Sequence, residues 1–122
     1  MSEYGPQIAA LARRAERDRE RLCRNPEAAA PEAANRYLRE GVGEAVGVYV
    51  DGRTGGRMVR FSPAEFAALE RAMNDWLECY ARCHGVELDA EFTLREAAEL
   101  LLETRNVHDV GRLLTGVPPR PG

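Results

Sequence analysis

The sequence contains no lysine, because all 17 of its basic residues are arginine. The chain therefore offers no side-chain amine for Schiff-base chemistry or for a P-loop phosphate site. Arginine codons can be rich in G and C, so this bias predicts a bacterial, phage or plasmid genome of high GC content. With 20 acidic residues the net charge is −3, which does not favour nucleic acid as the main partner.

Long apolar runs and an even set of cysteines are also missing. No stretch reaches the roughly 20 apolar residues that span a bilayer, and the first residues carry no apolar secretion signal. The three cysteines do not suit a disulfide framework. We therefore expect a cytoplasmic protein without membrane contact. Its 122 residues suit a single small domain over 1–117 with a proline-rich tail at 118–122.

The first part of the chain indicates two helices. Apolar residues recur at helical spacing from Tyr4 to Leu22, which predicts a helix over 4–24. This helix either docks on the core or projects as an arm. A short alanine-rich helix over about 32–40 follows it and is expected to end at Gly41.

The middle of the chain indicates strands. Val46, Val48 and Val50 alternate with other residues, and a second β-like run at 58–61 follows a segment rich in turn residues at 51–56. This pattern predicts a β-hairpin over about 46–61. Because a lone hairpin is marginal in water and its edges need a partner, we expect a homodimer.

Three helix starts are marked by capping residues. Ser62 with Glu65 predicts a long central helix over about 63–84. Thr93 and Asn106 predict two further helix starts. The expected fold class is α+β and mostly α-helical, with the hairpin packed on the central helix and the order helix–helix–strand–strand–helix–helix–helix. The inner face of the central helix is expected to hold Phe66, Leu69, Met73, Trp76, Leu77 and Tyr80.

Two groups of arginines are the candidate partner-binding residues. The first group shares one narrow arc of the helix over 4–24 and suits phosphates or an acidic protein surface. The competing interpretation is a solvated face on which Glu16 and Glu20 pair with arginines three or four residues away. The second group lies in the predicted hairpin. The seven residues are Arg13, Arg17, Arg21, Arg24, Arg53, Arg57 and Arg60.

No set of residues defines a reaction, so we expect neither an enzyme nor a cofactor. A metal site is the chemical alternative. Cys79 and Cys83 share one side of a helix and His84 follows them, so with His108 or Cys23 they form a set of four zinc ligands. The competing interpretation is that Cys79 and Cys83 are small buried hydrophobes. A zinc- or thiol-dependent protein thus stays open as an alternative.

The stretch RMVRFSPAEFAAL at 57–69 resembles the strand and first helix of ribbon-helix-helix regulators. In that family a short strand pairs with its twin across a dimer, and polar side chains of the ribbon read the major groove of DNA. The resemblance implies that Arg57 and Arg60 lie on the ribbon. It also implies that the helix opened by Thr93 is the family's second helix.

Together these features favour a small non-catalytic regulatory or inhibitory protein that acts by contact with a partner protein of acidic surface. The arginines of the first helix and of the hairpin are the expected contact residues. A dimeric DNA-binding regulator of the ribbon-helix-helix kind is the second interpretation, and the zinc- or thiol-dependent protein is the third.

Overall fold

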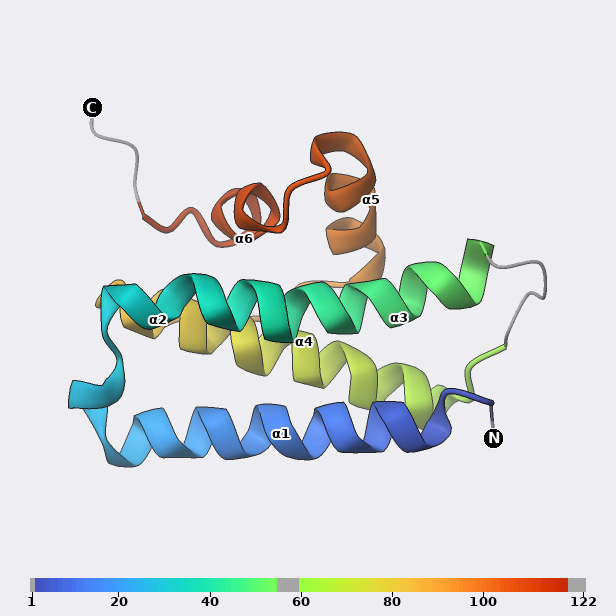
Figure 1. The fold of residues 1–122 in the computed structure, drawn as a ribbon, viewed down its shortest axis with the longest axis horizontal. Helices are drawn as coiled ribbons and strands as arrows, with labels where there is room; N and C mark the ends of the chain where they lie inside the picture. The colour runs from blue at the N-terminus through green and yellow to red at the C-terminus, as the bar shows by residue number, and fades with distance from the viewer. Residues whose placement is uncertain (1, 55–59, 119–122) are drawn as a thin grey trace.

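The computed structural model describes residues 2–54 and 60–118, and within these residues it contains helices and no strand (Figure 1). The predicted α+β class is therefore wrong, and the described chain is all-helical. No helix in these residues is both long enough and apolar enough to cross a membrane. The elements are α1 (Gly5–Arg24), η1 (Pro26–Ala28), α2 (Pro31–Arg36), η2 (Tyr37–Val42), α3 (Gly43–Thr54), α4 (Pro63–Cys83), α5 (Leu94–Thr104) and α6 (Val107–Thr115).

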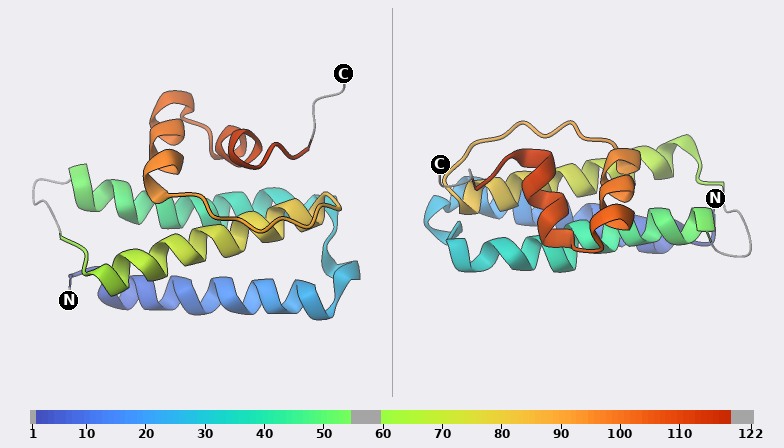
Figure 2. Two further views of the ribbon diagram at one scale, coloured as in Figure 1. Left: turned by 180° about the vertical axis from the view of Figure 1, so that it is seen from behind. Right: turned by 90° about the horizontal axis from the view of Figure 1, so that it is seen from above.

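The core is a bundle of three long rods. α2, the π-helical segment η2 and α3 follow one another without a break and form one rod. α4 lies between this rod and α1, and it packs against both (Figures 1 and 2). α1 therefore docks on the core and does not project as an arm. α5 and α6 lie on the side of the rod away from α1, with α5 against α3 and α6 against η2.

α4 forms where its cap predicts. The Ser62 hydroxyl accepts a hydrogen bond from the Glu65 backbone N–H at 3.1 Å, and Glu65 accepts one from the Ser62 N–H at 2.9 Å. The predicted inner face is confirmed with one exception: Phe66 is 37% exposed. Its buried members are Leu69, Met73, Trp76, Leu77 and Tyr80.

The predicted hairpin over 46–61 is replaced by α3, with residues 55–59 outside the described part of the chain. Val42, at the end of η2, and Ala45, Val46 and Tyr49 in α3 are buried and have helical spacing. Val48 is buried as well, because α3 packs against both α4 and α5. A helix that is buried on two sides carries apolar residues around most of its circumference. Its valines can therefore fall at alternate positions, as they would in a strand. Tertiary packing here outweighs the low helix propensity of valine and glycine.

The loss of the hairpin removes the reason for the expected homodimer. That expectation depended on an exposed strand edge, and residues 43–54 have no such edge because their backbone is helical. The dimer stays a prediction that nothing in the described residues supports.

An extended segment connects α4 to α5 by running back along α4 (Figure 2). On α4, Glu78 and Asn74 each accept a backbone hydrogen bond from this segment, at 3.1 and 2.9 Å, and Glu70 accepts one from the first residue of α5 at 3.0 Å. Four residues of helix rise about 6 Å and two extended residues span about 6.6 Å, so the two spacings match. We call this set the clasp. Its backbone donors are Ala90, Phe92 and Leu94.

Glu65 also ties the N-terminus of the chain to α4. Its carboxylate accepts hydrogen bonds from the Ser2 backbone N–H at 3.2 and 3.1 Å and from the Ser2 hydroxyl at 3.0 Å. The hydrogen bond from the Ser62 backbone, followed by those from Ser2, lowers the pKa of Glu65 below its usual value of 4.5.

We predict a pH-dependent stability contribution from Glu65. Because its folded-state pKa is lowered, the contribution is fully present above about pH 4.5 and disappears as the pH falls through the folded-state pKa. In urea unfolding, the gap in stability between wild type and Glu65→Gln should therefore shrink as the pH is lowered from 7 through this range. Glu103→Gln, on an exposed part of α5, controls for the change in net charge. A gap of constant size at all pH values would contradict this role of the carboxylate.

Candidate functional site

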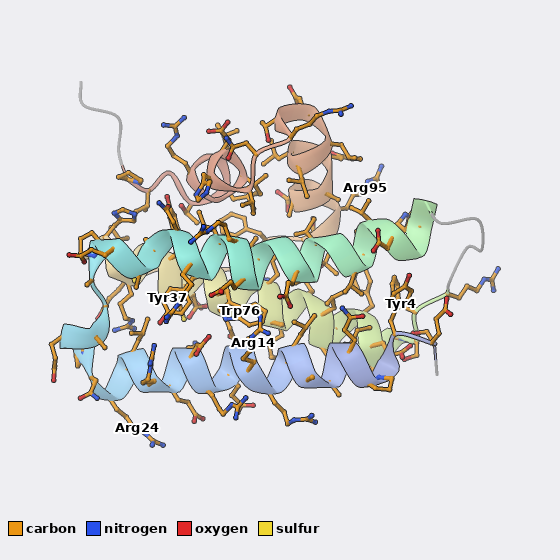
Figure 3. All side chains as sticks on the ribbon, in the orientation of Figure 1. Tyr4, Arg14, Arg24, Tyr37, Trp76 and Arg95 are labelled. Atoms are coloured by element: carbon orange, nitrogen blue, oxygen red, sulfur yellow. The ribbon has the colours of Figure 1, made fainter. Side chains whose placement is uncertain are left out.

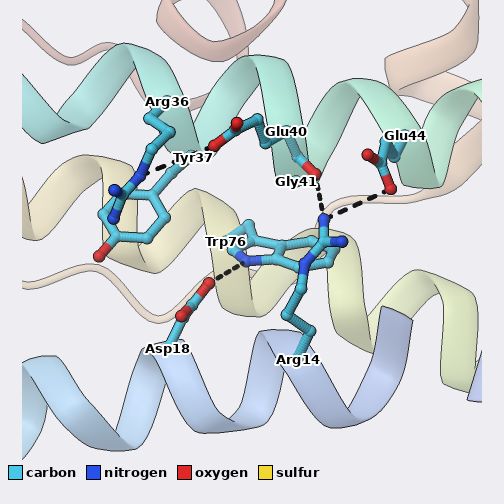
Figure 4. A pocket seen from close by; sticks show the side chains of 8 residues that line it. All are labelled: Arg14, Asp18, Arg36, Tyr37, Glu40, Gly41, Glu44 and Trp76. Carbon is cyan, nitrogen blue, oxygen red and sulfur yellow. Dashed lines mark hydrogen bonds and ion pairs between the residues drawn. The ribbon is translucent and has the colours of Figure 1, made fainter. Parts of the chain in front are cut away.

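A first cleft, which we call the tryptophan cleft, lies between α1 and the rod and has a volume of about 340 Å³ (Figure 4). The indole of Trp76, from α4, forms its floor and donates a hydrogen bond from Nε1 to Asp18 Oδ2 at 2.9 Å. The residues that line it are Arg14, Asp18, Arg36, Tyr37, Glu40, Gly41, Glu44 and Trp76.

Two guanidinium groups cover two aromatic rings in the tryptophan cleft. The Arg14 guanidinium lies 5.0 Å from the centroid of the Trp76 ring, and the Arg36 guanidinium lies 5.6 Å from that of Tyr37. Arg14 Nη2 also donates to the Glu40 carbonyl and pairs with Glu44 Oε2 at 3.4 Å. Both aromatic residues are buried under cations held by cation–π contacts and acceptor oxygens.

The backbone of the tryptophan cleft is unusual in two ways. Tyr37, Glu40 and Gly41 belong to η2, and π-helical turns are rare and often lie at functional sites. A Cβ atom added to Gly41 would lie 2.5 Å from the Trp76 ring, so only glycine lets the rod approach the indole this closely. Gly41 is therefore a packing residue inside the rod, and its prediction as the end of a helix is wrong.

A second cleft, which we call the aromatic–arginine cleft, lies where the end of α3 meets the start of α4. It has a volume of about 410 Å³. The Arg53 guanidinium lies 5.5 Å from the centroid of the Tyr49 ring, and Tyr49 makes an edge contact with Phe66 at 6.1 Å. The lining residues are Tyr49, Gly52, Arg53, Arg60, Phe61, Pro63 and Phe66. Two of the predicted partner-binding arginines thus share a cleft whose described lining residues include no carboxylate.

A neighbouring cleft of about 380 Å³ extends this surface toward α5 through Tyr49 and Arg53. Arg95 lies there, pairing with Glu99 at 3.2 Å, and Leu102 is 61% exposed. The surface therefore combines arginine and aromatic side chains with exposed apolar ones.

The predicted arginine face of α1 is present but less uniform than expected. Arg13, Arg17 and Arg24 are exposed and make no ion pair within the described residues, and Arg24 points away from the bundle (Figure 3). Arg21 instead donates to the Tyr37 hydroxyl at 3.0 Å, and this hydrogen bond raises the Arg21 pKa. The exposure of these arginines agrees with the competing interpretation of a solvated face, although the described part of the chain contains no ion pair from Glu16 or Glu20.

The candidate zinc ligands do not form one site. Cys23 is exposed on α1, whereas Cys79 and Cys83 are buried, and burial raises the pKa of both thiols. His84 and His108 line one small cleft of about 210 Å³. Even so, no group of three or more histidine, cysteine or acidic residues in the described chain is arranged to hold a metal ion. The two helical cysteines pack as buried hydrophobes do.

The ribbon expected from the resemblance at 57–69 is not supported. Residues 60–62 precede α4 without strand structure, and Arg57 lies outside the described residues. Arg60 lines the aromatic–arginine cleft and does not project from a strand. The capping box and the helix that follows are shared with many helical proteins, which explains why the resemblance arose.

The sequence pointed to the arginines but missed Trp76, Asp18 and Gly41 as parts of a cleft. The sequence did carry a signal for the side of the cleft formed by the rod, because the helical spacing of Tyr37, Gly41 and Glu44 would place them on one face of a continued helix. The break assigned at Gly41 hid this face.

The described residues define a small helical bundle whose clefts carry arginine and aromatic side chains. A family model for a domain of unknown function, DUF8055, matches residues 2–119, so the chain belongs to this family. No curated protein and no solved structure matches the chain at a significant level.

Proposed function

We propose that this chain is a small non-catalytic regulatory or inhibitory protein that acts in the cytoplasm by binding an acidic partner protein through the aromatic–arginine cleft. The observation that carries the proposal is the lining of this cleft, which combines Arg53 and Arg60 with three aromatic rings and, among the residues that the structure describes, no carboxylate. Free cysteines are in keeping with a reducing compartment.

The side chains of this cleft are of the types that dominate binding energy at protein interfaces. Tyrosine and arginine are enriched among such residues, and they act best in pockets that exclude water. Phe66 at the rim and Leu102 beyond it add exposed apolar area. A partner segment with carboxylates around one apolar side chain fits this combination, because the rings accept the apolar group and the guanidinium groups pair with the carboxylates.

The arginine face of α1 is the weaker candidate for the same partner. Glu20 lies three residues from Arg17 and four from Arg24, so a carboxylate shares that face and reduces its charge. The face can steer an acidic partner by its charge, but it offers no aromatic ring to anchor one.

Replacing Arg53 and Arg60 should weaken partner binding. The experiment captures partners from the source cells with the tagged chain and then titrates the purified partner by calorimetry. For Arg53→Ala/Arg60→Ala we expect the Kd to rise at least about tenfold, since each truncated contact at an interface centre costs about 1 kcal/mol or more.

Arg13→Ala/Arg17→Ala is the matched control because it removes the same charge from the other arginine surface. We expect it to change the Kd by less than about threefold, mostly through the association rate. A Kd that is unchanged by Arg53→Ala/Arg60→Ala, or a larger effect of the control, would contradict the proposed site.

A further inference from the structure

We propose that the tryptophan cleft is a binding site for an organic cation of the alkylguanidinium or alkylammonium class, and that Arg14 occupies this site in the free protein. This site lies on the α1 side of the rod and is distinct from the aromatic–arginine cleft. The failure of one proposal would therefore leave the other untouched.

The first support is the chemistry that the cleft already recognises. A guanidinium lies on the Trp76 face at 5.0 Å, a second lies on the Tyr37 face at 5.6 Å, and carboxylates stand beside both. Aromatic faces flanked by acceptor oxygens are the usual means of binding organic cations. An external cation would make the contacts that Arg14 makes now.

The second support is charge and space. The cleft is lined by three carboxylates and two guanidinium groups, so displacing Arg14 leaves it with an excess of negative charge. Its volume of about 340 Å³ lies within the range of small-molecule sites, roughly 300–1,000 Å³. The carboxylates are those of Asp18, Glu40 and Glu44.

The third support is that the covering cations can move while the floor is fixed. The side chains of Arg14 and Arg36 are 40% and 52% exposed, although the residues beneath them are buried. Trp76 is held by Asp18, and the close approach of Gly41 fixes the distance between the rod and the indole. Swinging Arg14 into solvent would expose a preformed aromatic face without moving the backbone.

The test follows Trp76 fluorescence, since this is the only tryptophan in the chain, while agmatine is added to the folded protein. Arg14→Gln removes the internal competitor, so we expect it to bind agmatine at least about tenfold more tightly than wild type does. Adding Glu44→Gln to Arg14→Gln should weaken binding at least about fivefold. The neutral urea analogue of agmatine should give no saturable change with any variant.

Arg19→Gln is the matched control, because Arg19 also extends from α1 to carboxylates of α4 but is not among the residues that line the tryptophan cleft. We expect it to bind agmatine as wild type does. Arg36→Gln, which uncovers Tyr37, supplies a second route if Arg14→Gln does not fold, with an expected gain of about threefold. Repeating the titration with an arginine blocked at both termini distinguishes the two sources of the cation, because this probe resembles an arginine side chain of a partner protein and agmatine resembles a free small cation. Saturable binding of either probe supports the site.

Three results would overturn the proposal. One is the absence of saturable agmatine binding in every variant that folds. Another is equal binding of the neutral urea analogue. The last is binding that Glu44→Gln leaves unchanged, because the cation would then sit elsewhere on the protein.

Discussion

Replacing Gly41 with alanine should destabilise the fold by about 2–3 kcal/mol, although the same change usually stabilises a helix. The added Cβ would lie 2.5 Å from Cγ and Cδ2 of the Trp76 ring, closer than a carbon atom can approach. The indole is buried and held by its hydrogen bond to Asp18, so moving it away from the added Cβ would disrupt this hydrogen bond and its packing. Urea unfolding measures the loss, and Trp76 fluorescence should change with it.

Gly47→Ala is the matched control for this prediction. Gly47 lies in α3, within the same rod, and a Cβ there would meet nothing within 4 Å. We expect a gain of about 0.5–1 kcal/mol from the higher helix propensity of alanine. Gly111→Ala should fall between the two, because its Cβ would meet the flexible end of Leu38. Gly41→Ala matching or exceeding wild-type stability would show that the rod does not approach Trp76 as described.

Replacing Asn74 with alanine should cost about 2 kcal/mol, because Asn74 is the central member of the clasp. Its amide accepts a hydrogen bond from the Phe92 N–H and donates one to the Phe92 carbonyl, both at 2.9 Å. Alanine would leave both partly buried backbone groups of Phe92 without a partner. Urea unfolding measures the loss of stability. Faster hydrogen exchange of the Phe92 amide should show that the loss arises at the clasp.

Glu70→Gln tests whether geometry or charge holds the extended segment. Glutamine keeps a side-chain oxygen that can accept the hydrogen bond from the Leu94 N–H, now made at 3.0 Å. We expect its effect to be less than half that of Asn74→Ala. Equal losses from the two variants would mean that electrostatic attraction, and not the matched spacing, fixes the segment.

The helices that the sequence predicts correctly are those with local signals. Three helices begin at caps whose residues lie within four positions of one another in the sequence. These caps are the capping boxes at Ser62 and Thr93 and the cap at Asn106. α1 was predictable because it buries one face only, which makes its apolar stripe plain.

α3 was not predictable from such signals, because its burial depends on elements far away in the sequence. α4 and α5 cover it from two sides, which removes the contrast between an apolar and a polar face. From the sequence alone Gly41 likewise indicates a helix end. Its actual role, which is to leave room for the Trp76 ring of another helix, depends on a contact that the sequence does not show. The clefts depend on the same long-range contacts, so candidate arginines could be named from the sequence for the aromatic–arginine cleft but no candidate residue for the tryptophan cleft.

The most direct test of the proposed contact surface is a nuclear magnetic resonance titration with a short peptide of glutamates around one phenylalanine. Binding at the aromatic–arginine cleft predicts chemical-shift changes concentrated on the rings of Tyr49 and Phe66 and on the guanidinium groups of Arg53 and Arg60. Shifts that follow the arginine face of α1 instead, or no saturable shift at all, would contradict it.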